Sequence, residues 1–246
     1  MGSINDISIN LIGLAMAKPV CNYEEFQWQF EKLKDSRDLF AFFLFDDRPS
    51  QKAVERFADE QYAWLDSLAH SASIFFFFFL RRNRGKIKTF FIRDWRAPTP
   101  ETKANMKGRI QNPSLEVGGL FGIKPNQLPG VVLFTLAPDR VGVSDGVYLP
   151  LNAKLFEGDL SHVEEVFTNL FSFIHECREI SSNTGQLLEN IKRKVSSLKR
   201  SERYRPLFLY IRGQLVSLTT FPGSLIEAIG KAFATEMARR IIIGQN

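Results

Sequence analysis

Three charged residues directly follow a predicted strand, and they are the first place where this sequence could do chemistry. An uninterrupted apolar run over 39–45 predicts a strand buried on both faces, and Asp46, Asp47 and Arg48 come next. Open α/β sheets bind ligands beyond the carboxyl ends of their strands, so this pair of carboxylates could hold a metal ion or transfer protons. However, no second acidic or histidine cluster follows at a useful spacing. The alternative is that both carboxylates end the strand in solvent.

The sulfur and imidazole groups of the chain are few and widely spaced. Cys21 and Cys177 are the two cysteines among 246 residues, and no Cys-x-x-Cys motif is present. His175 and Cys177 stand two positions apart in a predicted helix, so they point to different faces, which argues against a shared metal ion. We therefore expect inert thiols, no metal site and no cofactor.

A basic turn offers a second kind of site. Five cationic residues surround this predicted turn, namely Arg81, Arg82, Arg84, Lys86 and Lys88. Aromatic residues, including Trp95, follow them. Basic side chains bind phosphates and aromatic rings stack on bases, so this basic patch could bind single-stranded nucleic acid. The net charge of +5 permits such a partner without requiring it. The alternative is a solvated charged face.

The elements that would position these groups alternate between strands and helices. A second strand is expected over 74–80, where five phenylalanines are consecutive, and the helix between the two strands follows Pro49 and runs over 51–70. A strand, a helix and a parallel strand are the simplest arrangement of this stretch. Two more strands, over 131–136 and 146–151, come later in the chain.

Helices are expected before, between and after these strands. The pattern predicts a helix over 23–34, a short one over 114–123 and a strongly amphipathic one over 160–180. Residues 181–246 are predicted to form a mainly helical extension, whose last helix begins near Ser224. A helix in this extension, over 186–199, has an apolar stripe that needs a partner. That partner could be the body of the protein or a second copy, which would give a homo-oligomer through the C-terminal helices.

The segment before the 131–136 strand contains a proline in an informative place. Pro129 has no amide hydrogen to give to a ladder, so it marks a turn or an edge, and such X-Pro bonds are often cis. With the first strand and helix and the closing strands and helix, the run from Phe121 to Phe134 resembles the cis-proline corner of the thioredoxin-like superfamily. The resemblance covers about residues 37–180. It implies an α/β fold with a mixed sheet flanked by helices, preceded by an N-terminal segment and helix over 1–36.

The same resemblance locates a redox motif from which the sulfur is missing. Redox members carry Cys-Gly-Pro-Cys where a helix begins, and aligning that motif here gives Arg48, Pro49, Ser50 and Gln51. Disulfide exchange needs a thiolate, so the resemblance implies a redox-inactive member. Its partner groove is expected where residues 48–51 meet Leu128 and Pro129. In redox relatives the backbone beside the cis-proline pairs with an extended segment, and that pairing does not depend on sulfur.

Composition sets the remaining expectations. A hydrophobic share of 44% and a charged share of 24% are ordinary for soluble globular proteins. No stretch approaches the roughly 18 apolar residues that cross a bilayer, and the apolar N-terminal segment lacks the basic residues of a signal peptide. We expect a cytoplasmic protein-binding or scaffolding module that is not an enzyme. The alternatives are a nucleic-acid-binding protein and a non-redox enzyme that uses Asp46 and Asp47.

Overall fold

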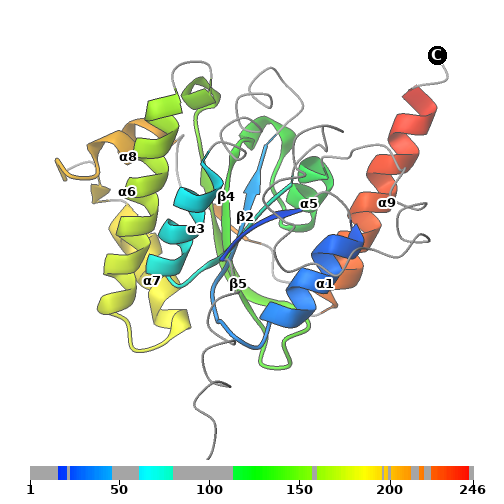
Figure 1. The fold of residues 1–246 in the computed structure, drawn as a ribbon, viewed down its shortest axis with the longest axis horizontal. Helices are drawn as coiled ribbons and strands as arrows, with labels where there is room; N and C mark the ends of the chain where they lie inside the picture. The colour runs from blue at the N-terminus through cyan, green and yellow to red at the C-terminus, as the bar shows by residue number, and fades with distance from the viewer. Residues whose placement is uncertain are drawn as a thin grey trace, which may run out of the picture.

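A mixed sheet lies between two layers of helices (Figure 1). This arrangement comes from a computed structural model, which describes residues 16–20, 23–45, 61–79, 113–156, 160–195, 197–198, 201–211, 216–218 and 223–243. The α/β class expected from the sequence is confirmed. None of the described helices is long and apolar enough to cross a membrane.

The sheet has six strands in the order β1-β3-β2-β4-β5-β6. Their bounds are Ala17–Val20 (β1), Phe40–Leu44 (β2), Phe75–Phe79 (β3), Gly130–Leu136 (β4), Val143–Pro150 (β5) and Val216–Ser217 (β6). Strand β2 runs parallel to β3, as the strand–helix–strand interpretation of residues 39–80 requires. Strand β1, which the sequence did not predict, also runs parallel to β3. Strand β4 is antiparallel to β2, and β5 and β6 continue the antiparallel half.

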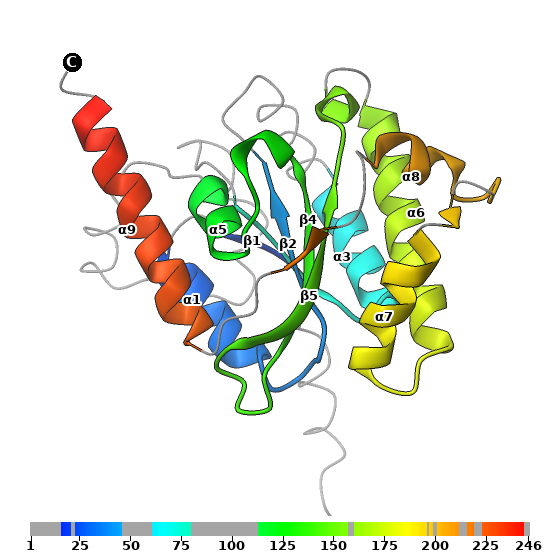
Figure 2. The ribbon, with the colours of Figure 1, turned by 180° about the vertical axis from the view of Figure 1, so that it is seen from behind.

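Helices cover both faces of this sheet (Figures 1 and 2). One face carries α1 (Tyr23–Leu33), α5 (Ser114–Leu120) and α9 (Leu225–Ile243). The other carries α3 (Tyr62–Ser71), α6 (Leu160–Glu179), α7 (Thr184–Val195) and α8 (Arg205–Tyr210). Two 3-10 turns, η2 (Pro125–Gln127) and η3 (Ala153–Phe156), lie directly before β4 and after β5.

Phenylalanine fills the space between the sheet and each helix layer. Alternation along a strand sends successive side chains to opposite faces, so the phenylalanines of β2 and β3 divide between the two layers. On the α1 face, the Phe26 ring lies 5.9 Å from Phe42 and 5.6 Å from Phe77 between centroids. On the α6 face, the Phe76 ring lies 5.8 Å from Phe167 and 5.4 Å from Phe171. Burial on both faces explains why these strands are continuous apolar runs.

A half-buried arginine joins the end of α6 to the turn before β3. Arg178 donates from Nε to the carbonyl of Ala72 and from Nη2 to that of Ser73, both at 3.1 Å. Ser73 has a φ of 52°, in the left-handed region, so this turn is sharply bent. Burial lowers the pKa of Arg178, and the two carbonyls satisfy the donors that it keeps away from water.

The described C-terminal elements lie against the body of the protein. Helix α7 packs on β4 and β5, β6 joins the sheet, and α9 packs on α1 and α5. Leu225, Ile229 and Phe233 are buried in the α9 contact. The apolar stripe of the 186–199 helix thus has its partner within the chain. The boundary near residue 181 and self-association through these helices remain predictions.

Candidate functional site

The cis-proline corner, predicted at Leu128 and Pro129, lies where β4 begins. The peptide bond between Leu128 and Pro129 is cis, and Gly130 follows as the first residue of β4. Gly130 pairs with Leu44, the last residue of β2. The carboxyl end of β2 therefore lies beside the Pro129 corner, and Asp46, Asp47 and Arg48 follow that end in sequence.

A tyrosine from the neighbouring strand holds this corner in place. The fully buried Tyr148 of β5 donates its phenol hydrogen to the carbonyl of Gln127 at 2.9 Å. A Cβ at Gly130 would lie 2.5 Å from the Leu149 carbonyl oxygen and closer still to the Tyr148 hydroxyl. Glycine is needed here because no side chain fits beneath the phenol. On the far side of the proline, Leu151 N donates to Pro129 O at 2.8 Å.

The corner itself is covered, and only the turn before it is accessible. Leu128 is 2% exposed, and Pro129 is also buried. Lys124, Pro125 and Asn126 are exposed. The Gln127 side chain accepts a hydrogen bond from Lys124 N at 2.7 Å, which closes this turn on itself. A partner reaching this end of the sheet therefore meets residues 124–126 rather than the side chains of Leu128 and Pro129.

Several predicted site residues lie outside the described residues. These are Arg48, Pro49, Ser50 and Gln51 of the groove, Asp46 and Asp47, Cys21, and the basic patch Arg81, Arg82, Arg84, Lys86 and Lys88. Of the predicted groove, the structure thus places Leu128 and Pro129. The meeting of residues 48–51 with this corner stays a prediction.

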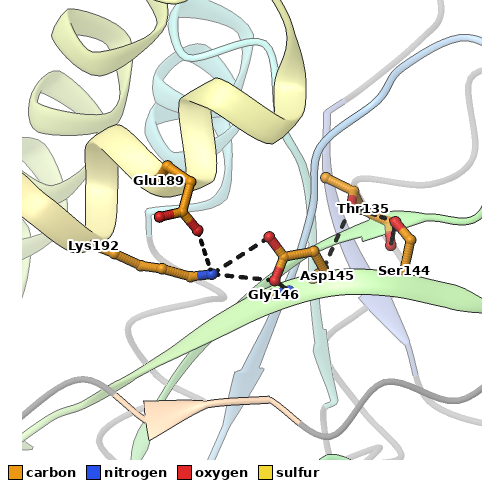
Figure 3. A network of polar contacts seen from close by, with 6 residues as sticks. All are labelled: Thr135, Ser144, Asp145, Gly146, Glu189 and Lys192. Atoms are coloured by element: carbon orange, nitrogen blue, oxygen red, sulfur yellow. Dashed lines mark hydrogen bonds and ion pairs between the residues drawn. The ribbon is translucent and has the colours of Figure 1, made fainter.

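A polar network that the sequence did not predict lies at the opposite end of the antiparallel strands (Figure 3). Lys192 of α7 reaches Asp145 of β5 at 3.2 Å and Glu189 at 2.9 Å. Asp145 also accepts the backbone hydrogen of Gly146 at 2.7 Å. In the sequence, Lys192 lies within the predicted helix over 186–199, and no motif singles it out. Its partner Asp145 stands 47 positions away, and no local spacing connects them.

Two hydroxyl groups complete this network where the β4–β5 register shifts. The Thr135 and Ser144 side-chain oxygens lie 2.9 Å apart, and Ser144 Oγ donates to Leu136 O at 3.1 Å. The shift between Thr135 and Leu136 disrupts the regular ladder, and these side chains bond to backbone groups there. We interpret the network as structural because each group has a partner within the protein.

The environment of Lys192 favours its charged form. Burial alone would lower the pKa of Lys192, but hydrogen bonds to Glu189 and Asp145 outweigh it and raise that pKa. The lysine is therefore a permanent cation near neutral pH. It does not have the lowered pKa of a catalytic base.

The described cysteine is inert, and the nearby histidine faces another way. Cys177 is fully buried, and burial raises its thiol pKa to about 11. A nucleophilic or redox cysteine needs a lowered pKa and access to solvent. His175 is exposed, with Nε2 3.5 Å from Glu179. Among the described residues, no group of three or more His, Cys, Asp and Glu side chains could hold a metal ion.

Comparison of the chain with protein-family models, with curated proteins and with solved structures finds no match.

Proposed function

We propose that this chain is a redox-inactive member of the thioredoxin-like superfamily that binds a protein partner at the carboxyl end of β2. With the two 3-10 turns η2 and η3 left aside, the described strands and α-helices from β2 to α6 follow the order strand, helix, strand, helix, strand, strand, helix. The resemblance implies that order. The observation that carries the proposal is the pairing of Leu44 with Gly130, which puts the end of β2 beside the Pro129 corner.

The missing sulfur supports binding rather than catalysis. Residues 48–51 read Arg-Pro-Ser-Gln, and the described cysteine is a buried thiol of raised pKa. None of these residues supplies the accessible thiolate that disulfide exchange needs. What the corner offers is shape: an exposed turn over residues 124–126, held rigidly by Tyr148 and Gln127.

Restoring the two sulfurs tests the structural half of this proposal. If residues 48–51 occupy the place of the redox motif, the Arg48→Cys, Gln51→Cys variant should form an internal disulfide and gain dithiol-dependent reduction of insulin. The parent chain and the single Arg48→Cys variant should show no such activity. A double variant whose two thiols stay free under mild oxidation would contradict the alignment with the motif.

Site-specific cross-linking tests the binding half. A photo-crosslinking amino acid at Asn126 should capture a discrete protein in extract of the cells that make this chain. The same group at Glu179, which is exposed at the C-terminal end of α6, serves as the control. Lys124→Glu should abolish the Asn126 product because it reverses the charge of the turn. Equal yields from both positions, or no product from Asn126, would count against this binding surface.

A further inference from the structure

The positive charge of this chain is concentrated between α7 and α8. Residues 190–205 contain seven lysines and arginines against one acidic residue, Glu202, so this stretch alone exceeds the net charge of +5 that the whole chain carries. Lys192 points toward the sheet, where Asp145 and Glu189 bind it (Figure 3). The other cations of the stretch that the structure describes are Arg193, Lys194, Arg203 and Arg205.

Three of these cations lie around the C-terminal part of α6. Burial raises the pKa of the Cys177 thiol, and the charges of Lys194 and Arg193 act against that rise, so both cations lie near this turn of the helix. Arg203 forms an ion pair with Glu176, the residue before Cys177, and its side chain remains 66% exposed. The end of α7 and the residues that lead into α8 thus bring their cations together at the outer edge of the helix layer that contains α6 (Figure 2).

An exposed apolar side chain lies next to these cations. Leu209 of α8 is 63% exposed, the largest exposed fraction among the large hydrophobic side chains of the described residues. Arg205 stands one turn earlier in the same helix and is also exposed, so the two side chains share a face. The Tyr204 ring is instead buried against Phe173, with the ring centroids 5.7 Å apart. The four cations and Leu209, here called the cationic surface, therefore place an exposed aliphatic side chain beside positive charge.

We propose that the cationic surface docks on a membrane that contains anionic lipids. The headgroups of such a membrane attract clustered lysines and arginines, and the acyl boundary just beneath them accepts an exposed leucine. A nucleic acid would bind the same cations, but it stacks its bases on aromatic rings, and Tyr204 is buried here. It would also leave Leu209 against its phosphates. The proposal does not rest on the binding surface at residues 124–126, so either proposal can fail alone.

Co-sedimentation with lipid vesicles tests this proposal. The full chain should bind vesicles of phosphatidylserine and phosphatidylcholine, and it should not bind vesicles of phosphatidylcholine alone. Lys194→Gln, Arg205→Gln should lower the partition coefficient about twentyfold, and the exposed single change Arg205→Gln should lower it about fivefold. Leu209→Gln keeps every charge and should lower it about tenfold, because the leucine no longer enters the acyl boundary.

A charge-matched variant separates this surface from the net charge of the chain. Lys32→Gln, Lys231→Gln removes two exposed cations from α1 and α9, on the other face of the sheet. It should bind the anionic vesicles as the parent chain does. Retention of the parent unfolding midpoint in urea identifies the variants that are folded, and the single Arg205→Gln change, at an exposed position, serves if the double variant is not.

Four results would overturn the proposal. Equal losses from the two double variants would show attraction by net charge alone, and failure of the parent chain to sediment would show no attraction at all. Binding that Leu209→Gln leaves unchanged would indicate a phosphate-binding surface without contact to the acyl chains. Displacement of the chain from vesicles by polyuridylate at an equal phosphate concentration would assign the cations to nucleic acid instead.

Discussion

The phenol of Tyr148 lies directly over the backbone of Gly130 while it donates to the carbonyl of Gln127. The Tyr148 side chain thus fixes both ends of the corner, namely the turn that ends at Gln127 and the first residue of β4, Gly130. The covered Leu128–Pro129 peptide lies between these two contacts.

Gly130→Ala should be strongly destabilising, because the new methyl group would overlap the Tyr148 hydroxyl and the Leu149 carbonyl. Both belong to the rigid β4–β5 pair and cannot move apart cheaply. We expect a loss of about 3 kcal/mol in the free energy of unfolding, measured by urea denaturation. Gly119→Ala is the matched control: a Cβ there meets nothing within 4 Å, and this helical substitution should be neutral or stabilising by up to about 1 kcal/mol. Similar losses at both positions would refute this account.

Tyr148→Phe should keep the packing of the corner and release its turn. The ring remains, but Gln127 O loses its donor, which costs about 1 kcal/mol of stability. We expect faster amide hydrogen exchange for residues 124–128 and unchanged exchange in the middle of α6. If the turn exchanged at the parent rate, the hydrogen bond would not be what holds it.

Lys192→Met should loosen α7 from β5. Since the lysine is about one-quarter exposed, solvent screens its ion pairs, and we expect a loss of about 1 kcal/mol. The pKa of Lys192 is raised above its ordinary 10.5, so its contribution is complete below that pH and disappears as pH rises through the raised value. The stability difference between the parent and the variant should therefore shrink above about pH 10.5. A pH-independent difference would show that packing, not charge, accounts for it.

Cys177→Ala should reduce the alkaline sensitivity of the fold. Burial raises the thiol pKa from 9.0 to about 11, so the folded state retains a proton that the unfolded chain releases. The parent chain should then lose up to about 2 kcal/mol as pH rises from 9 to 11, and the variant should lack this part of the loss. Unfolding by urea at a series of pH values measures both. In a Cys21→Ser background, iodoacetamide should modify Cys177 quickly only after unfolding; rapid modification of the native protein would contradict its burial.

Much of the sheet could be predicted because its central strands carry a strong local signal. The apolar runs of β2 and β3 permit little else than doubly buried strands, and the periodicity of α6 fixes its buried face. Strand β1 carries no such signal: four residues that include Lys18 and Pro19 neither alternate nor form an apolar run. These residues form a strand because they pair with β3, and this tertiary contact cannot be predicted from the local sequence.

The candidate site was less predictable for the same reason. Because proline has no amide hydrogen, Pro129 could be placed just before a strand. Its burial depends on the residues that cover it in the fold, which the local sequence does not encode. Residues 207–210 belong to α8, although no clear period marks them in the sequence. No motif in the sequence singles out Asp66 or Asp145. Each acquires its role from backbone amides that folding brings to it.

The five consecutive phenylalanines of β3 carry no side-chain pattern that could set the register of this strand. In most strands a slip by one residue would exchange core and solvent side chains, so the hydrophobic pattern selects the register. A slip by one residue within this run replaces one phenylalanine by another, so the side chains on both faces of the sheet stay the same. The register of β3 must therefore be set by contacts outside the strand. Arg178 supplies such contacts, because it donates to the carbonyls of Ala72 and Ser73 in the turn before β3. By holding the turn before β3, Arg178 fixes the register of the strand.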